Sequence, residues 1–407
     1  MKVIHLSTSD SGGAGRAAFR IHKSLLKIGV NSKMWVDISN TGEKTVRSPE
    51  GKFNKTLAFM RRYTRIPFLK LLKTKNPVLH SPATFPSFWI KKINDSNADI
   101  VNLHWVQHEM LSISDIAKIK KPLVWTLHDM WAFCGAEHIA WDNRWQNGYT
   151  KNNRPSHERG FDINRWTWLR KIKYWKKSFQ IITPSSWLTE CVQKSKLMNT
   201  WPSLTIPNSI DTEFWKPINK NLARDKLNLS EKDLILFFGS SNSNYEHHKG
   251  FDLLSQALRK IKKENKINIQ LFIFGQSKSN KNLSLDFPAR YVGYLGDIKL
   301  KTLYSAVDAV VVPSRQESFG QVASEASACE TPVIAFNTGG LRDIIKHRVT
   351  GYLAEKFNIE DLANGIQWVL QNTDIELLGN KARKQVENNF DSKIVAKKYL
   401  DIYYQNL

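Results

Sequence analysis

The chain has 407 residues, of which 41% are hydrophobic, and it carries a formal net charge of +23. That size without a long low-complexity tract suits two globular domains, and no apolar run approaches the length needed to span a bilayer. The three cysteines, Cys134, Cys191 and Cys329, are far apart and odd in number. They argue for a reducing compartment and against a disulfide framework or a zinc site. Because Met1 to Ser7 turns polar at once, no signal peptide is expected.

The positive charge is concentrated in the first half of the chain. Residues 1–220 hold 35 Lys and Arg against 16 Asp and Glu, whereas residues 221–407 hold 25 against 21. We therefore expect the first half to meet an anionic partner.

The first strand, Val3 to Leu6, leads into a glycine-rich turn and then a helix from Ala17 to Lys27. The turn contains Gly12, Gly13 and Gly15, so an anion can approach the backbone closely. The spacing is not the G-x-G-x-x-G fingerprint of dinucleotide sites, which favours a phosphate-bearing substrate over a nicotinamide or flavin cofactor. A tight turn without a ligand is the alternative.

Residues 51–94 contain no acidic residue. Basic and large apolar side chains alternate between 52 and 75, and Pro67 divides the segment into two amphipathic pieces. Such segments lie on anionic membrane surfaces. On this interpretation Arg61, Arg62 and Arg65 reach the lipid, and their replacement by Glu leaves the fold intact. A helix with its apolar side packed on the domain is equally open, and no recognised motif supports nucleic acid.

Two strands, Ile100 to His104 and Leu123 to Leu127, follow, and the second ends in His128-Asp129. A histidine at the carboxyl end of a strand is placed for site chemistry, although a structural role is equally open. A basic, tryptophan-rich helix is expected over 161–177 and a strand over 180–183. Residues 206–217 are interpreted as the interdomain linker.

A second α/β series begins at the strand Leu234 to Gly239. Lys249, beside Gly250 at a turn into a helix, suits a phosphate contact, and a surface lysine is the alternative. Further strands are expected over 270–274, 290–292, 308–312 and 333–336. Gly339-Gly340 opens another turn, and helices near 359–370 and 391–403 close the chain.

The segment after the buried strand Ala309 to Val312 carries two carboxylates. Glu317 lies in the loop and Glu325 in the following helix, whose first N–H groups are assigned to residues 318–321. In open α/β sheets ligands bind outside such strand ends, and a helix N-terminus attracts phosphate. An ordinary βα unit with two solvated glutamates is the alternative.

These motifs, in this order, resemble the family 4 retaining glycosyltransferases of the GT-B fold, in particular the subgroup that builds bacterial surface polysaccharides such as colanic acid. The resemblance covers essentially the whole chain. It rests on Gly12 to Arg16, His128 to Trp131, Ile206 to Asp211, Lys249-Gly250, Glu317 and Glu325 with Phe319-Gly320, and Gly339-Gly340.

The resemblance implies two facing Rossmann-like domains with the active site in the cleft between them. The N-terminal domain, residues 1–206, would bind the acceptor, and the C-terminal domain, residues 207–390, the nucleotide-sugar. A helix over 391–407 would pack back toward the N-terminal domain. No metal and no cofactor are expected.

By position, the resemblance assigns a role to each matching residue. Lys249 would bind the donor diphosphate, Glu317 and the backbone of residues 318–322 the phosphate and sugar hydroxyls, and Glu325 the ribose. Gly13 would lie over the phosphates, His128 near the reacting sugar, and Leu295 beside the base. The donor-binding set is therefore Gly13, Lys249, Leu295, Ser318, Phe319, Gly320, Gln321, Val322 and Glu325, with His128 and Glu317 as the catalytic pair.

Two departures from the family pattern stand out. The arginine that family members often carry six positions before the lysine is Ser243 here, with Arg16 and His248 as candidate substitutes. The cysteine cluster of the subgroup is missing from residues 149–155, which leaves only Cys134 and does not favour metal or thiol chemistry there.

The sequence thus predicts a retaining, metal-independent glycosyltransferase that moves a sugar from a nucleotide-sugar to a lipid-linked saccharide, in the cytoplasm at the inner face of the cytoplasmic membrane. An epimerase or phosphorylase of the same architecture, or a non-catalytic basic protein that binds membrane or nucleic acid, is the alternative. Nucleic acid is not the expected partner. The donor sugar, the acceptor and the linkage stay open.

Overall fold

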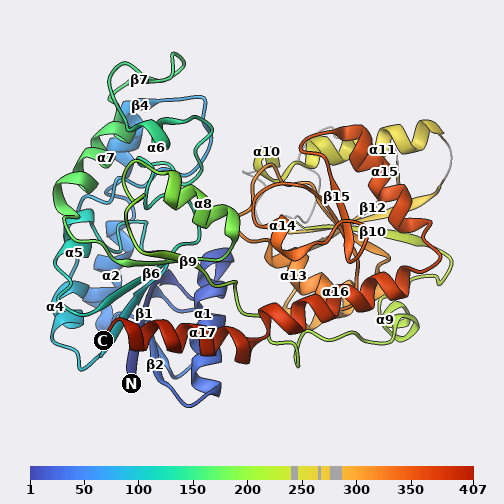
Figure 1. Cartoon of the computed structure of the whole chain (residues 1–407), viewed down its shortest axis with the longest axis horizontal. Helices are drawn as coiled ribbons and strands as arrows, with labels where there is room; N and C mark the ends of the chain where they lie inside the picture. Colours follow the sequence, from blue (N-terminus) through green and yellow to red (C-terminus); the bar gives the residue numbers. More distant parts are fainter. Residues whose placement is uncertain (240–245, 265–266, 276–286) are drawn as a thin grey trace. The chain divides into compact units, whose positions relative to one another are not determined.

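The structure is a computed structural model that describes residues 1–239, 246–264, 267–275 and 287–407. Residues 1–209 together with 395–407 form one compact unit, and residues 210–394 form the other. Each unit is an α/β layer structure built on its own parallel sheet (Figure 1). Ser243 lies outside the described residues.

The sheet of unit 1 has the strand order β3-β2-β1-β5-β6-β8-β9, and all of its paired strands run parallel. The strands are β1 (Lys2–Ser9), β2 (Asn31–Ile38), β3 (Val46–Arg47), β5 (Ile100–Leu103), β6 (Leu123–Thr126), β8 (Gln180–Thr183) and β9 (Ser203–Thr205). A separate antiparallel pair joins β4 (Leu72–Lys73) to β7 (Arg159–Gly160).

The helices of unit 1 cover this sheet. They are α1 (Gly12–Lys27), α2 (Gly51–Arg61), α3 (Ile66–Leu71), α4 (Trp89–Asn94), α5 (Ile113–Ala117), α6 (Arg144–Asn147), α7 (Ile163–Tyr174) and α8 (Ser186–Lys194), joined by the C-terminal α17 (Ser392–Gln405). Val395, Tyr399 and Tyr403 of α17 pack in one buried cluster with Val3 of β1 and Ile21 of α1. One face of α17 therefore packs into the core of the unit that also contains β1.

The described part of unit 2 has the sheet order β12-β11-β10-β13-β14-β15, again parallel throughout. The strands are β10 (Leu234–Gly239), β11 (Ile269–Phe274), β12 (Ala289–Gly293), β13 (Ala309–Val312), β14 (Val333–Phe336) and β15 (Gly351–Ala354). The helices are α9 (Lys220–Lys226), α10 (Glu246–Lys249), α11 (Phe251–Glu264), α12 (Asp297–Ala306), α13 (Gln321–Ala328), α14 (Leu341–Ile344), α15 (Ile359–Leu370) and α16 (Ile375–Phe390).

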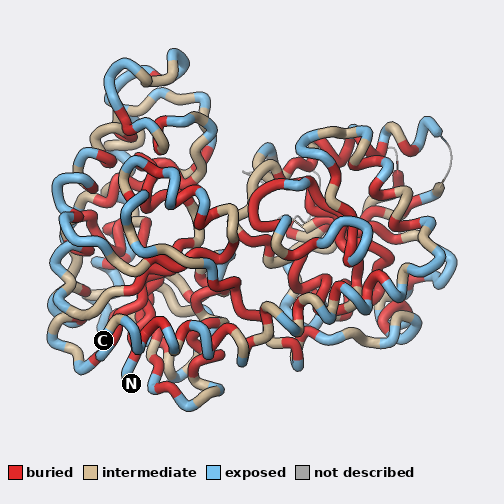
Figure 2. Tube along the Cα trace, viewed as in Figure 1, coloured by how far each residue is buried: buried red, intermediate tan, exposed pale blue. Residues whose placement is uncertain are grey.

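Both sheets are buried on their two faces, which explains the uninterrupted apolar runs of their central strands. Every residue of β5, β13 and β14 is buried, and the buried segments run through the middle of each unit (Figure 2). In unit 1 the order of the strands reverses between β1 and β5, and in unit 2 between β10 and β13. Ligands of doubly wound sheets bind at such switch points, outside the carboxyl ends of the strands.

Candidate functional site

In unit 2 the switch point brings together two of the predicted residues. Glu317 lies in the loop between β13 and α13, and Lys249 lies at the end of α10, before α11. The ammonium of Lys249 lies 2.5 Å from Oε1 of Glu317, and the hydroxyl of Ser314 donates to the same oxygen at 3.0 Å. Burial is the largest single influence and raises the pKa of Glu317, but the charge of Lys249, its neighbour His248 and the hydrogen bonds from Lys249 and Ser314 together outweigh burial and hold the pKa below its ordinary value. Glu317 is therefore an ionised, paired carboxylate.

Two glycines, Gly250 and Gly339, pack against the backbone of the loop that carries Glu317. Gly250 and Gly339 both have positive φ, +70° and +56°. A Cβ on Gly250 would collide with the carbonyl of Pro313, and one on Gly339 with the backbone of Glu317. The N–H of Gly340 also donates to the carbonyl of Glu317 at 2.8 Å. The loop that carries Glu317 is thus held between two backbone segments that only glycine permits.

Arg315 fixes the same loop from the side, and sequence analysis gave it no role. Its guanidinium donates to both carboxylate oxygens of Asp252 in α11, at 2.8 and 2.6 Å. Its backbone N–H donates to the carbonyl of His248 at 3.0 Å. Burial lowers the pKa of His248 to about 4, so this ring is neutral at pH 7, and its part as a substitute for the arginine stays a prediction.

Helix α13 begins later than the sequence analysis placed it. Its first residue is Gln321, Gly320 is its N-cap with φ +111°, and the N–H of Ser324 donates to the carbonyl of Gly320 at 3.0 Å. The N–H groups of the first turn are therefore those of residues 321–323, not 318–321. The side chain of Phe319 is buried against Phe390, at 5.5 Å between ring centroids, which leaves its backbone for a ligand. Ser318, Gln321 and Val322 are half-buried.

The two remaining predicted residues of unit 2 lie in different surroundings. Glu325 is buried in α13, where the hydroxyl of Tyr304 donates to its Oε2 at 3.2 Å. Leu295 lies half-buried between β12 and α12 and packs against the apolar cluster of the unit. The assignments of Glu325 to the ribose and of Leu295 to the base stay predictions.

In unit 1 the glycine-rich segment is the start of a helix, because α1 begins at Gly12 and not near Ala17 as predicted. Gly13 is exposed in its first turn, and a Cβ there would meet no atom within 4 Å. A Cβ on Gly15 would instead lie 2.5 Å from the carbonyl oxygen of Ser9 in β1. Helix–strand packing therefore requires Gly15, whereas packing places no such demand on Gly12 or Gly13.

His128 lies two residues after β6 and is half-buried. Its Nε2 lies 3.0 Å from Nδ1 of His104, and Nε2 of His104 lies 2.9 Å from Nδ1 of His5. Burial lowers the pKa of His128 to about 4, and the charge of Asp129 offsets only part of that effect. Sequence reasoning missed His5 and His104, and the available signal was a histidine in or just after each of three strands.

A second polar group holds the loop that follows His128. Asp129 accepts from Nδ1 of His138 at 2.6 Å, from the indole of Trp105 at 2.8 Å and from the N–H of Trp131 at 2.9 Å. His138 also contacts the hydroxyl of Ser81 through Nε2 at 2.8 Å. Ser81 is completely buried, so this Asp–His–Ser arrangement supports the loop and offers no nucleophile to a ligand.

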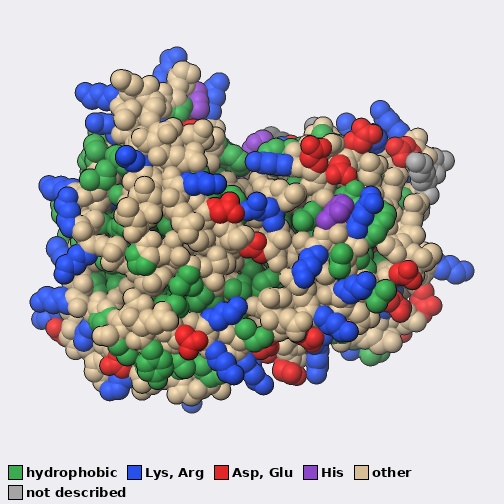
Figure 3. All heavy atoms as spheres, in the orientation of Figure 1, with side chains coloured by type: hydrophobic (Ala, Val, Ile, Leu, Met, Phe, Trp, Pro, Cys, Tyr) green, Lys and Arg blue, Asp and Glu red, His purple; other side chains and the backbone are tan. Residues whose placement is uncertain are grey.

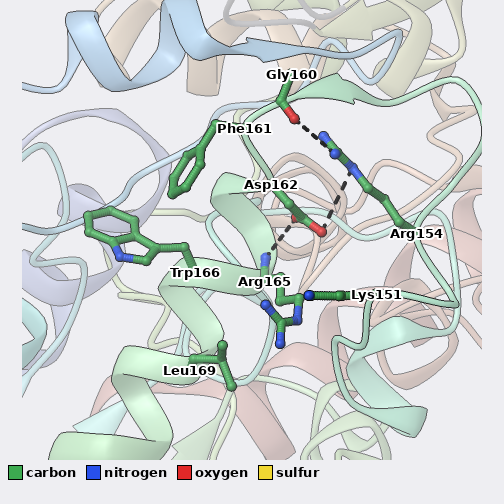
Figure 4. Close-up of a pocket in the computed structure, with 8 residues that line it drawn as sticks. All are labelled: Lys151, Arg154, Gly160, Phe161, Asp162, Arg165, Trp166 and Leu169. Carbon is green, nitrogen blue, oxygen red and sulfur yellow. Dashed lines mark hydrogen bonds and ion pairs between the residues drawn. The ribbon is translucent and has the colours of Figure 1, made fainter.

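A pocket of about 390 Å³ opens elsewhere in unit 1, at β7 and the start of α7 (Figure 4). Arg154 donates to the carbonyl of Gly160 at 2.9 Å and lies 3.8 Å from Asp162. Phe161 and Trp166 supply aromatic walls. None of the predicted site residues lines this pocket. The carboxylate of Asp162 compensates part of the positive charge of Lys151, Arg154 and Arg165.

The segment after Glu50 presents apolar side chains to solvent. Phe53 is 78% exposed, and the other large exposed side chains of α2, α3 and the turns beside them are Leu57, Phe59, Met60, Tyr63, Ile66 and Leu71. Lys52, Lys55, Lys70, Lys73 and Lys75 are exposed among them. On the face shown in Figure 3, Lys and Arg are frequent over both units, and acidic side chains lie among them. We call residues 51–75 the apolar-basic surface.

One arginine of this segment contradicts the prediction. Arg61 is only 7% exposed, and its guanidinium donates to the carbonyls of Glu109, Phe85 and Pro86. Arg61 therefore fixes α2 to the unit, and its replacement by Glu is expected to damage the fold. The segment does fold as two short helices, α2 and α3, and Pro67 lies in the first turn of α3.

Comparison with known proteins identifies the family. Residues 11–214 match the family model described as Glycosyltransferase Family 4, and residues 219–391 the model described as Glycosyl transferases group 1. Uncharacterized glycosyltransferase MJ1607 of Methanocaldococcus jannaschii is 32% identical over 181 residues, covering 42% of this chain and 45% of that protein. Lipopolysaccharide 1,2-N-acetylglucosaminetransferase of Salmonella typhimurium is 26% identical over 236 residues, covering 54% and 60%. The chain spans about half the length of the curated relatives that it matches.

A solved structure, Anabaena Alr3699/HepE in complex with UDP-glucose, matches with a TM-score of 0.68 and 16% identity over 100% of both chains. At that identity the likeness shows the fold alone. The two Rossmann-like parallel-sheet units are those of the GT-B fold, which confirms the predicted fold class.

Proposed function

The chain belongs to glycosyltransferase family 4, and from this premise we propose that it transfers a sugar from a nucleotide-sugar donor to a saccharide acceptor, with retention of configuration and without a metal ion. The observation that carries the proposal is the paired Lys249 and Glu317 at the switch point of unit 2, beside the N-terminus of α13. The relative that makes lipopolysaccharide and the neighbour that binds UDP-glucose support surface polysaccharide as the product and a nucleoside diphosphate as the leaving group.

The proposed roles follow from the charges that develop in the reaction. The bond between C1 of the sugar and the phosphate oxygen breaks, the acceptor oxygen bonds to C1 on the same face, and the acceptor proton passes to the departing phosphate. Lys249 and the N-terminus of α13 would stabilise the negative charge on the phosphate. The helix after Gly339 has only four residues, so its dipole would contribute little. Glu317 would bind sugar hydroxyls and would not act as a nucleophile.

His128 would hydrogen-bond the donor sugar or the charge that develops on it. Because burial lowers its pKa to about 4, the ring is neutral at pH 7. A neutral imidazole suits hydrogen bonding, whereas transfer of the acceptor proton to the phosphate leaves no step that requires it as a base. Removing one preorganised donor costs about 10²–10³ in turnover. We expect that loss in His128→Ala, with little change in affinity for the nucleoside diphosphate.

The deciding experiment begins with a thermal-shift screen of UDP-glucose, UDP-N-acetylglucosamine, GDP-mannose and ADP-glucose. The donor that stabilises the protein most is then tested for hydrolysis and for transfer to membrane-extracted saccharides, and NMR of the product determines the anomer. His128→Ala, checked for an unchanged melting temperature, is the control for the site. Absence of stabilisation by every donor and of turnover would refute the proposal and favour a non-catalytic protein.

We further propose that the acceptor is lipid-linked and that the apolar-basic surface binds the anionic inner face of the cytoplasmic membrane. The basis is the exposed side chain of Phe53 beside exposed Lys52 and Lys55. No helix in the described ranges is long and apolar enough to cross a bilayer. Each lysine near anionic lipid is worth about 1 kcal/mol.

Charge reversal tests this surface. Lys52→Glu with Lys55→Glu should weaken binding to phosphatidylserine-containing vesicles about thirtyfold or more, because two attractive charges of about 1 kcal/mol each are lost. The matched control reverses Lys397 and Lys398, which are exposed on α17. Equal binding of the wild-type protein to neutral vesicles, or equal loss in the control, would contradict the proposal.

A further inference from the structure

The row formed by His5, His104 and His128 results from the order of the strands. His5 lies in β1, His104 directly follows β5, and His128 follows β6, and these three strands are neighbours in the sheet. Adjacent rings are nearly parallel, with interplanar angles of 28° and 22° and centroid separations of 5.1 and 5.3 Å. In the part of the chain that the structure describes, no group of three or more His, Cys, Asp or Glu is placed to hold a metal ion.

All three rings are electrically neutral at pH 7. Burial lowers the pKa of His5 and of His104 well below the ordinary value, and neighbouring histidines lower both further. Burial likewise lowers the pKa of His128 to about 4. Each ring therefore carries one proton, on one of its two nitrogens.

Three protons and two ring-to-ring hydrogen bonds leave only two arrangements. If His5 carries its proton on Nδ1, it donates to Nε2 of His104, His104 donates from Nδ1 to Nε2 of His128, and Nδ1 of His128 carries the last proton. If His5 carries its proton on Nε2, every bond reverses and Nδ1 of His128 becomes an acceptor. The tautomer of His128 is thus coupled to that of His5, through His104.

The inner end of the row selects between the two arrangements. Nε2 of His5 is buried and has no hydrogen-bond partner among the described residues. In the second arrangement this nitrogen would hold a buried N–H without a partner, and among backbone groups a buried N–H without a partner is rare in folded proteins. At the outer end, no hydrogen bond from a described residue engages Nδ1 of half-buried His128.

We propose that His104 and His5 are positioning residues that hold His128 as the Nδ1–H tautomer, so that His128 presents a neutral hydrogen-bond donor to an oxygen of the donor sugar. This inference rests on the proposed function for the identity of the acceptor atom, whereas the coupling of the tautomers does not depend on it. The backbone supports the row, because the N–H of His104 donates to the carbonyl of Leu6 at 2.9 Å. The carbonyl of His104 accepts from the indole of Trp125 at 3.1 Å.

The first test needs no ligand. ¹⁵N NMR of the full-length protein labelled at histidine distinguishes protonated from unprotonated ring nitrogens, and the His128 signals are identified by their loss in His128→Asn. We expect Nδ1 of His128 to carry the proton and Nε2 to be unprotonated at pH 7.5. A proton on Nε2 of His128 in the wild-type protein would overturn the inference.

The second test compares two substitutions of His104. In His104→Asn the side-chain amide replaces the Nδ1–H donor toward His128, whereas His104→Leu removes it. One hydrogen bond changes the ratio of the two tautomers by a factor of about three to ten, so His104→Leu should lower the Nδ1–H fraction and reduce kcat by at most that factor with UDP-glucose, or with the best donor of the screen. Affinity for the nucleoside diphosphate should not change, and His104→Asn should stay within about twofold of wild type.

These outcomes separate the inference from the proposed function. Equal loss of kcat in His104→Asn and His104→Leu, at equal melting temperatures, would show that His104 does not act through the tautomer. If His104→Leu fails to fold, the wild-type NMR measurement still decides. Full turnover in His128→Ala would refute the role of His128 in the reaction and would leave the tautomer measurement standing.

Discussion

Removal of Lys249 tests the proposed diphosphate site most directly. Its ammonium lies 2.5 Å from Glu317, and the two side chains are only 26% and 16% exposed. Opposite charges near a protein surface interact by about 4 kcal/mol at 4 Å, and the net value of a charged hydrogen bond after desolvation is about 1.5–3 kcal/mol. Lys249→Ala should therefore lower the free energy of unfolding by about 1.5–3 kcal/mol. The same change should raise the pKa of Glu317, because burial then acts without a compensating cation.

The same substitution should weaken binding of the nucleoside diphosphate about ten- to 150-fold, because a charged contact to phosphate is lost. Glu317→Gln should not weaken that binding, since it releases Lys249 from its partner, but it should reduce turnover of the nucleotide-sugar. Titration calorimetry with the diphosphate of the best donor and urea unfolding measure the two effects. In the double variant the losses of stability should be smaller than their sum, because the two residues form one pair.

Lys260→Ala is the matched control for Lys249. Lys260 forms an exposed pair with Glu360 in the same unit, at 2.9 Å, and such surface pairs contribute about 0–1 kcal/mol. If Lys249→Ala binds the diphosphate within twofold of wild type, or if Lys260→Ala destabilises the protein equally, the reasoning about the paired lysine is wrong.

Three further outcomes are expected. Glu325→Ala should weaken binding of the nucleoside diphosphate about ten- to a hundredfold through lost ribose contacts, and unchanged calorimetric affinity would remove Glu325 from the site. Arg61→Ala should lower the free energy of unfolding in urea by about 3–5 kcal/mol, because it leaves buried carbonyls unpaired. Lys55→Ala on the same helix should change it by no more than about 0.5 kcal/mol. Similar values for the two variants would contradict the anchoring role of Arg61. Burial holds the pKa of His22 and of His128 at about 4, below the ordinary 6.5, so the unfolded chain binds protons first as the pH falls. The free energy of unfolding should be highest above pH 6.5, and between pH 6.5 and pH 4 it should fall by about 1.4 kcal/mol per pH unit for each such histidine. Equal melting temperatures at pH 7.5 and pH 5.5, measured by calorimetry, would exclude this.

Long apolar runs in the sequence predict the central strands. The predicted strands at 234–239 and 180–183 coincide with β10 and β8, and the helix at 359–370 coincides with α15. Parallel strands covered on both faces must be continuously apolar, so the local pattern is sufficient there. The two-residue edge strand β3 and the four-residue edge strand β15 escaped prediction, because so short a segment shows no clear period. Helix α16 also escaped prediction, although its buried Leu378, Ala382, Val386 and Phe390 recur at the spacing of one helix face.

The sequence by itself determined the two α/β series, the order of the motifs and the residue types available for phosphate chemistry. Only the tertiary structure decided that Lys249 pairs with Glu317, that Gly339 presses on the same loop, and that Arg61 points inward while Lys55 faces solvent. The physical reason is separation along the chain. Local periodicity reports which side of an element is buried, but contacts between residues 68 or 99 positions apart depend on which strands become neighbours.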